Sequence, residues 1–224
     1  MTRFLIPASL AATLLLSLVH SSSIRSGHAD VPIAPSADLV QPLQAGDPAP
    51  RFIVETVDSE PFDFDPHNLE RPVMVLVFRG GWCPYCNMHL SEMRHVIPEI
   101  RDLGVDVLFL SGDRSELLYE SLEAEAKEDI AELDYTILSD ADAQAAIALG
   151  IAFRSNKRTA DYVKNKGDGY QASSMDRHGV LPVPSVFAIG TDGVIAYSYV
   201  NPDYKIRLPA DDLLAAAKAI AAAD

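Results

Sequence analysis

Cys83 and Cys86 are the two cysteines of the 224-residue chain, and they lie three positions apart. Residues at this spacing share one face of a helix, so their sulfurs can close into a disulfide. A bridge across so short a loop removes little entropy from the unfolded chain and therefore adds little stability. The spacing thus favours reversible dithiol–disulfide chemistry, with Cys83 and Cys86 as the candidate catalytic residues and the candidate redox-active disulfide.

The segment FRGGWCPYC, residues 78–86, predicts that the pair lies at the start of a helix. Pro84 suits the first helical position, which needs no backbone donor. We therefore expect Cys83 at the helix cap and Cys86 in the first turn, where unpaired backbone N–H groups and the helix dipole lower a thiol pKa. Cys86 also begins an apolar stripe, so we expect it to be the less exposed thiol and Cys83 to meet the reaction partner.

Three further residues are candidates for supporting roles around the cysteines. Arg79 could stabilise a thiolate by its charge, although an arginine at a strand end often faces solvent. Trp82 is expected to pack over the cysteine pair. Pro184 opens a strand about 100 residues downstream. A cis peptide bond at Pro184 would leave backbone groups free to pair with an extended substrate.

Hydrophobic patterns predict an α/β fold around this segment. Residues 73–78 form an unbroken apolar run, which is typical of a strand buried on both faces. A helical pattern follows from Pro84 to Gly104, with an expected kink at Pro98, and residues 105–110 form the next strand. This strand–helix–strand unit has the length that a right-handed parallel crossover needs.

Other patterns complete a mixed central sheet flanked by helices. Residues 185–189 and 194–200 flank a turn and predict an antiparallel hairpin. Residues 153–179 show no clean period and suggest a surface insertion or lid. The remaining predicted elements are an edge strand at 51–57, helices at 115–133, 141–149 and 208–223, and a short strand at 135–138.

The first 29 residues are typical of an export signal. They have a short basic start, an apolar stretch at 4–19, and the small residues Gly27 and Ala29 before a possible cut at Asp30. An uncleaved membrane anchor is the alternative, disfavoured because about 16 mostly apolar residues fall short of the roughly 20 that span a bilayer. We expect a periplasmic or secreted protein, membrane-anchored if the leader is retained, with no other membrane-spanning segment.

Composition divides the rest of the chain into two parts. Residues 30–45 are rich in proline and alanine and predict a linker or loose arm, whereas 46–224 predict a single folded domain. The formal net charge is −14 at pH 7. This acidity makes nucleic acids and anionic membrane surfaces poor partners.

Three motifs occur in a fixed order: GDPAPRF at 46–52, the cysteine segment at 78–86, and VPSVF at 183–187. Together they resemble the thioredoxin-like superfamily, and within it the Cys-x-x-Cys branch of the alkyl hydroperoxide reductase/thiol-specific antioxidant family of peroxiredoxin-like proteins. The resemblance covers residues 45–223. It implies a thioredoxin-like fold and an antioxidant enzyme that reduces peroxides and possibly protein disulfides. It also implies a thiol electron donor, such as a thioredoxin-like protein, and no prosthetic group.

The resemblance leaves the roles of the two cysteines open. Comparison with ordinary peroxiredoxins aligns Cys86 with the peroxide-reacting cysteine, whereas comparison with thioredoxin makes Cys83 the attacking thiol. Ordinary peroxiredoxins also carry a proline seven residues and a threonine or serine three residues before the reactive cysteine, and an activating arginine. Here those places hold Arg79, Cys83 and, near the late strand, Pro184. Arg79 and Arg114 could replace the lost positive charge.

A second hypothesis is metal binding without turnover. Cys83, Cys86 and the downstream His178 resemble the copper site of thioredoxin-fold assembly proteins, although those proteins place three residues between their cysteines rather than two. A zinc site would need two further ligands, and the chain has no second cysteine pair. His89 and His95 are expected on the helix surface.

Overall fold

The computed structural model describes residues 32–118, 136–167 and 173–223. The export signal predicted at 1–29 and most of the helix predicted at 115–133 lie outside these residues. The described start of the latter is a short 3-10 helix, η3 (Ser115–Leu117). None of the helices in the described ranges combines the length and the hydropathy that a bilayer crossing requires.

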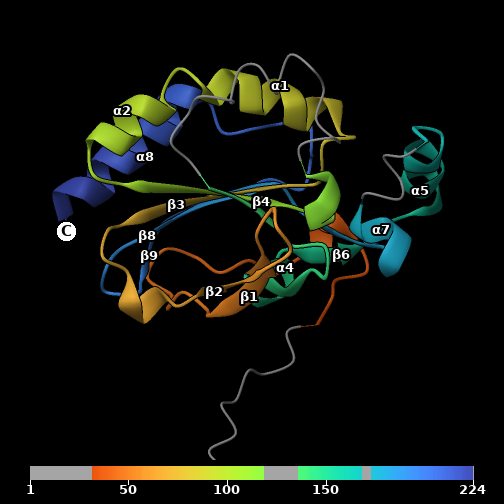
Figure 1. Cartoon of the computed structure of the whole chain (residues 1–224), viewed down its shortest axis with the longest axis horizontal. Coiled ribbons are helices and arrows are strands. Elements are labelled where there is room, and N and C mark those ends of the chain that lie inside the picture. Colours follow the sequence, from red (N-terminus) through yellow and green to blue (C-terminus); the bar gives the residue numbers. More distant parts are fainter. Residues whose placement is uncertain (1–31, 119–135, 168–172, 224) are drawn as a thin grey trace, which may run out of the picture. The chain divides into compact units, whose positions relative to one another are not determined.

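A seven-stranded mixed sheet forms the centre of the fold, in the order β2-β1-β5-β4-β3-β8-β9 (Figure 1). Strands β3, β4 and β5 are parallel to one another, and the other neighbours pair antiparallel. The predicted α/β fold with a mixed sheet is therefore confirmed. The strands are β1 (Phe52–Glu55), β2 (Pro61–Phe64), β3 (Val73–Phe78), β4 (Asp106–Ser111), β5 (Thr136–Ser139), β8 (Ser185–Ile189) and β9 (Ile195–Val200).

One strand at the edge of the sheet differs from the sequence-based expectation. β1 is not an edge strand, because β2 pairs with its outer side over four residue pairs. The aromatic rings of Phe52 and Phe64 stack across this pair at 4.6 Å between centroids. β2 is short and begins with a proline, which weakens its strand pattern in the sequence.

The crossover from β3 to β4 contains two helices rather than one kinked helix. α1 (Pro84–Met93) ends before the turn at 94–96, and α2 (Ile97–Asp102) follows. Pro98 lies in the first turn of α2, where its missing N–H leaves no hydrogen bond unmade. The helix direction therefore changes before the proline and not at it.

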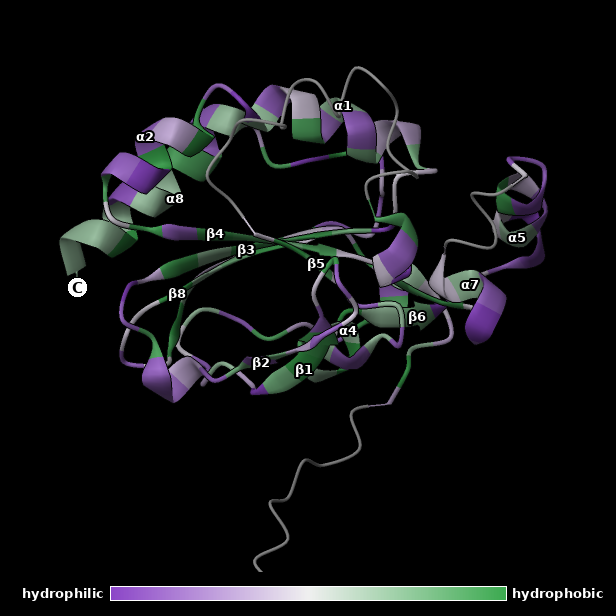
Figure 2. Ribbon diagram, viewed as in Figure 1, coloured by the Kyte–Doolittle hydropathy of each residue, from purple (hydrophilic) through white to green (hydrophobic). Residues whose placement is uncertain are grey.

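Alternate residues of β3 pack against two different layers. Met74 and Leu76 belong to the core under α1, α2 and α8 (Ala210–Ala223), whereas Val75 and Val77 belong to the core that includes α4 (Gln144–Ala148). All six residues of β3 are buried, as predicted for a strand covered on both faces. Figure 2 shows the hydrophobic residues concentrated on the central strands between these layers.

Three short elements lie in the described part of the segment without a clean period. They are β6 (Ala152–Arg154), α5 (Lys157–Lys164) and α7 (Ser174–Arg177). β6 pairs antiparallel with β7 (Val180–Pro182) in a separate two-stranded sheet. Asn156 caps α5, because its side chain accepts a hydrogen bond from the Thr159 N–H at 2.9 Å. Each element spans at most about two turns or three residues, too little for a period to emerge from the sequence.

The described part of the predicted linker packs against the domain. The Ala34 N–H donates to the Ala152 carbonyl at 3.0 Å, and the Arg154 N–H donates to the Ala34 carbonyl at 2.9 Å. A Cβ at Gly150 would lie 2.1 Å from the Gln41 carbonyl oxygen, so glycine is required for this close approach. The arm (residues 32–45) thus differs from a loose linker, because its backbone groups find partners that its composition does not reveal.

Candidate active site

The cysteines lie where the local sequence places them. Cys83 is the N-cap of α1 with extended backbone, Pro84 follows in the first turn, and Cys86 lies in the same turn. Both cysteines are in the dithiol form, and both are 1% exposed. The exposed fraction therefore does not distinguish the two cysteines. Cys83 lines a cavity of about 580 Å³, however, and Cys86 does not.

The two thiols have pKa values shifted in opposite directions. The hydrogen bond from Cys86 is the largest cause that lowers the pKa of Cys83, to about 6, with Arg79 and Arg207 contributing by charge. Burial, followed by the interaction with Cys83, raises the pKa of Cys86 well above its ordinary value. One proton is thus held on Cys86 while Cys83 carries the negative charge.

The start of α1 contributes less to this charge separation than the sequence predicts. The Cys83 side chain makes no capping hydrogen bond. Among the causes that lower the pKa of Cys83, the hydrogen bond from the backbone N–H of Cys86 is the smallest. The neighbouring thiol and two arginines have larger effects. A tertiary arrangement, rather than the helix end alone, stabilises the thiolate.

Arg207 is a functional candidate that the sequence analysis missed. Its Nη2 lies 3.3 Å from Cys86 Sγ and donates a hydrogen bond to it. Its Nε and Nη1 are buried and have no hydrogen-bond acceptor among the described residues. Arg207 lies between β9 and α8 with no motif around it, and 121 positions separate it from Cys86. The sequence indicated only that a positive charge is needed near the cysteines, and not which residue supplies it.

Arg79 is buried rather than solvent-facing. Its guanidinium carbon lies 5.0 Å from the ring centroid of Trp82 and 4.6 Å from that of Tyr204. The Tyr85 ring meets Tyr204 edge to face at 5.6 Å between centroids. Trp82 is also buried, and it packs beside Arg79 at the cavity. Aromatic faces thus hold the Arg79 charge near Cys83 through cation–π contacts.

Two buried polar side chains hold the loop that carries the cysteines. Asp113 Oδ2 accepts a hydrogen bond from the Gly81 N–H at 2.6 Å, and Asn87 Nδ2 donates to the Gly81 carbonyl at 2.6 Å. Gly80 has φ of +137°, and a Cβ there would lie 2.5 Å from Asp113 Oδ1. Position 80 therefore requires a glycine, because its backbone conformation is unfavourable for other residues and a Cβ would clash with Asp113.

Pro184 lies at the cavity, but its peptide bond is not cis. None of the described peptide bonds is cis. Pro184 therefore does not free backbone groups for an extended substrate by a cis bond, as the sequence analysis expected. Val183 and Pro184 line the same cavity as Cys83. The Ser185 hydroxyl donates to the Val183 carbonyl at 2.7 Å, which leaves this turn internally bonded. Pro184 therefore contributes a wall of the cavity.

The copper hypothesis is not supported by the placement of His178. Its Nδ1 accepts from the Val180 N–H at 3.1 Å, so Nε2 carries the proton and donates to the Ala141 carbonyl at 2.9 Å. Both ring nitrogens are thus occupied away from the cysteines. Within the described ranges, no group of three histidine, cysteine or acidic residues could hold a metal ion.

His89 is partly buried and not a surface residue as expected. Its Nε2 lies 3.0 Å from the Leu208 carbonyl oxygen. Burial and the charge of Arg207 lower the pKa of His89 to about 4, so the ring is neutral at pH 7 and donates to that carbonyl. His89 thereby links α1 to the segment that carries Arg207.

Comparisons with known proteins identify the family and the fold of the chain. The model of the AhpC/TSA family matches residues 45–198. Peroxiredoxin Bcp of Escherichia coli K12 is 32% identical over 112 residues, covering 50% of this chain and 67% of that protein. The thiol-disulfide oxidoreductase ResA of Bacillus cereus is 27% identical over 75 residues, covering 34% of this chain and 42% of that protein.

Solved structures with the same fold include a peroxiredoxin-like protein from Aquifex aeolicus, with a TM-score of 0.59 and 18% identity. That match covers 80% of this chain and 89% of the other. Peroxidoxin BcpB from Mycobacterium tuberculosis has a TM-score of 0.54 and 20% identity over 80% and 98% of the two chains. The chain is a peroxiredoxin-like thiol oxidoreductase of thioredoxin-like fold, and it belongs to the AhpC/TSA family.

Proposed function

We propose that the protein reduces peroxides with Cys83 as the attacking thiolate and Cys86 as the resolving thiol. One observation carries this assignment: the cysteine with the lowered pKa is also the one that lines the cavity. The thiolate is the nucleophile in such chemistry, so a peroxide entering the cavity meets Cys83 in its reactive form. The family membership supports peroxide as the substrate.

The reaction balances in two steps. The Cys83 thiolate attacks one peroxide oxygen, the O–O bond breaks, and the other oxygen leaves as an alcohol or water after taking a proton. Cys83 is then a sulfenic acid. The Cys86 sulfur attacks Cys83, water leaves, and the Cys83–Cys86 disulfide forms. A thiol electron donor, a thioredoxin-like protein being the class that the resemblance implies, returns the pair to the dithiol.

Arg207 has a defined place in the second step. Once Cys83 is a sulfenic acid, it no longer bears the negative charge that raises the pKa of Cys86. The hydrogen bond from Arg207 then favours the Cys86 thiolate that must attack. In the first step Arg79 has the larger effect, because its charge lowers the pKa of Cys83 more than the charge of Arg207 does. Trp82, Pro84 and Pro184 support the site as walls of the cavity and as the start of α1.

The same cysteine pair could reduce protein disulfides, and the similarity to ResA favours this as a second activity. The chemistry would start from the same Cys83 thiolate, which attacks a disulfide sulfur instead of a peroxide oxygen. The buried position of Cys83 limits this activity to disulfides that can reach into the cavity.

Substitution of each cysteine tests the assignment of roles. We expect Cys83→Ser to abolish peroxide consumption, because the attacking sulfur is lost. Cys86→Ser should consume about one equivalent of peroxide per chain and then stop at the sulfenic acid. Peroxide loss measured without reductant distinguishes the two. The reverse pattern would exchange the roles, and undiminished peroxide loss by the double variant would refute the activity.

The pH dependence of Cys83 alkylation tests the charge separation. Because the thiolate reacts and the thiol does not, the rate of iodoacetamide labelling at Cys83 should rise with pH around a midpoint of about 6. Cys86→Ala removes the hydrogen bond that is the largest cause of the lowered pKa, so its midpoint should move upward. Site-specific labelling followed by mass spectrometry gives both midpoints. Equal midpoints in the two proteins would contradict the shared proton.

Arg207→Gln tests the second step, with Lys205→Gln as a matched control that removes an exposed charge two residues away. Hydrogen bonds to charged groups contribute about 1.5–3 kcal/mol, so disulfide formation after stoichiometric peroxide should slow at least about tenfold in Arg207→Gln. The control should form the disulfide at the wild-type rate. Tryptophan fluorescence of Trp82 follows the step, and equal rates in both variants would exclude this role for Arg207.

Export is a separate part of the proposal. The basic start, the apolar stretch at 4–19 and the small residues before Asp30 support a cleaved leader and a periplasmic or secreted protein. Mass spectrometry of the protein recovered from the exported fraction should show an N-terminus at Asp30. Recovery of the whole chain from the cytoplasm would contradict export, and recovery of the uncleaved chain from membranes would indicate the anchor.

A further inference from the structure

The cavity at Cys83 is much larger than a small peroxide. Its volume is about 580 Å³. Hydrogen peroxide has the size of about two water molecules, each of which occupies roughly 30 Å³ in the liquid. The cavity instead falls within the range of about 300–1,000 Å³ that is typical of sites for organic ligands. Most of its lining therefore has no role in binding hydrogen peroxide.

The charged residues of the cavity favour an anion. Arg79, Arg154 and Arg158 line it against one acidic residue, Asp38. This excess of positive charge contrasts with the net charge of −14 for the chain. Arg154 and Arg158 are exposed at the rim and form no ion pair within the described ranges. A local cationic site in an acidic protein attracts anionic ligands selectively.

Two buried donors at the cavity have no acceptor in the described part of the protein. They are Arg79 Nε and Trp82 Nε1, and both side chains line the cavity. Trp82 Nε1 lies beside Gly80 and the carboxylate of Asp113, so Arg79 Nε is the donor that can serve a ligand. A buried polar group without a hydrogen bond is costly, so such groups indicate where a ligand atom binds. Arg79 Nε fits a carboxylate or peptide oxygen, while the aromatic side chains of Phe153 and Tyr162 provide an apolar wall.

The recess of Cys83 restricts the kind of thiol that can react with it. Cys83 is 1% exposed and is reached through the cavity. A cysteine on the surface of a folded donor protein would have to project into this space past the arm and α5, whose residues Asp38 and Arg158 stand on its walls. A small thiol enters without such a constraint.

We propose that the cavity binds a low-molecular-weight thiol carrying carboxylates, and that this thiol reduces the Cys83–Cys86 disulfide. This inference rests on the proposed dithiol–disulfide cycle and names its electron donor. The donor thiolate attacks the Cys83 sulfur, the Cys83–Cys86 bond breaks, and Cys86 leaves as a thiolate that takes a proton. A second donor thiolate attacks the donor sulfur of the mixed disulfide. Two donor thiols become one disulfide, and Cys83 and Cys86 return to the dithiol.

Glutathione and its diethyl ester are suitable probes, because they present the same thiol with and without carboxylate charges. The rate of reduction of the oxidised protein is followed by the fluorescence of Trp82, the single tryptophan of the chain. We expect glutathione to react faster than the ester. Arg154→Gln with Arg158→Gln should reduce the ratio of the two rate constants about tenfold, since each exposed ion pair contributes up to about threefold to fivefold.

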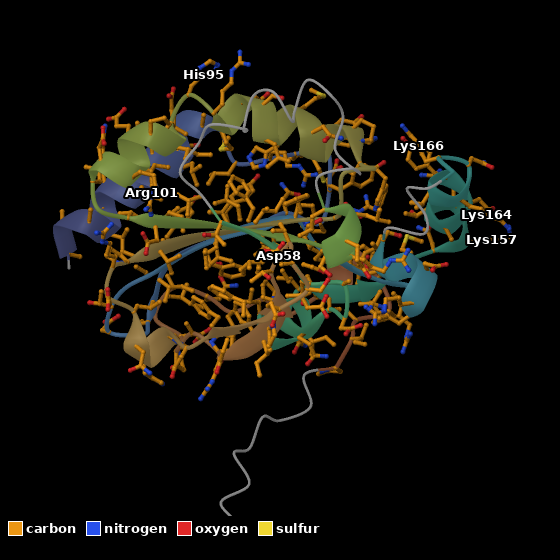
Figure 3. All side chains as sticks on the ribbon, viewed as in Figure 1. Asp58, His95, Arg101, Lys157, Lys164 and Lys166 are labelled. Carbon is orange, nitrogen blue, oxygen red and sulfur yellow. The ribbon has the colours of Figure 1, made fainter. Side chains whose placement is uncertain are left out.

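Lys157→Gln with Lys164→Gln is the matched control. Both lysines lie on α5 (Figure 3), and their loss removes the same charge, but neither lines the cavity. This control should retain the wild-type ratio. An equal fall in both double variants would mean that only the general field matters and would overturn the proposal. An unchanged ratio in the arginine variant would also overturn it.

Two further arms separate this proposal from the peroxidase function. Peroxide consumption with the uncharged reductant dithiothreitol tests the cycle alone. If wild-type protein consumes peroxide with dithiothreitol but glutathione does not react faster than its ester, the small-thiol site is refuted and the peroxidase function stands. Reduction by a thioredoxin provides the comparison with a protein donor. If thioredoxin reduces the disulfide rapidly while glutathione does not, the small-thiol donor is refuted although the peroxidase function stands.

Discussion

The proton shared between the sulfurs of Cys83 and Cys86 is the interaction on which the rest of the site depends. Cys86 lies on the core side of α1, where burial opposes a negative charge, and it therefore keeps the proton and donates it to Cys83. Cys83 receives that hydrogen bond, lines the cavity and is affected by the charges of Arg79 and Arg207, so it carries the negative charge. Packing of α1 against the sheet is thus also a chemical constraint, because it decides which sulfur is the nucleophile.

The loop before α1 makes this arrangement possible. β3 delivers the chain at Phe78, and the two sulfurs keep their relation to the cavity only if residues 79–83 follow one path. Asp113, two residues after β4, binds the N–H of Gly81, and Asn87 on α1 binds the carbonyl of Gly81. The loop is thereby fixed to both elements of the crossover. Gly80 admits the close approach of Asp113, so a glycine at position 80 is a geometric requirement of the site.

The sequence predicts what depends on local pattern. The buried strand β3, the position of Cys83 and Cys86 at the start of α1, and the antiparallel pairing of β8 with β9 follow from hydrophobic runs, proline chemistry and a turn. The strand β2 and the short elements between Ala152 and Arg177 escaped prediction, because they are too short to show a period.

The features that the sequence leaves hidden depend on contacts between distant residues. Arg207 reaches Cys86 across 121 positions, and Tyr204 stacks on Arg79 without any local motif. The arm is held by backbone hydrogen bonds from residues such as Ala34, which composition cannot reveal. His178 illustrates the opposite error: its position in the sequence suggested a ligand, but its ring bonds to Ala141 and Val180.

The two arginines at the cysteines solve different electrostatic problems. A charge interaction at a few ångströms is strong only where water is excluded, and both guanidinium groups are buried or partly buried there. The rings of Trp82 and Tyr204 lie against the guanidinium of Arg79 and hold its charge at the cysteines. Arg207 instead donates directly to the Cys86 sulfur, and its remaining donors have no acceptor among the described residues. In the proposed second step, this hydrogen bond would favour the negative charge on Cys86. Arg114, which the sequence offered for this purpose, lies 4.0 Å from Asp176 instead. The positive charge needed at the cysteines is thus supplied by one residue of the motif and one from the end of the fold.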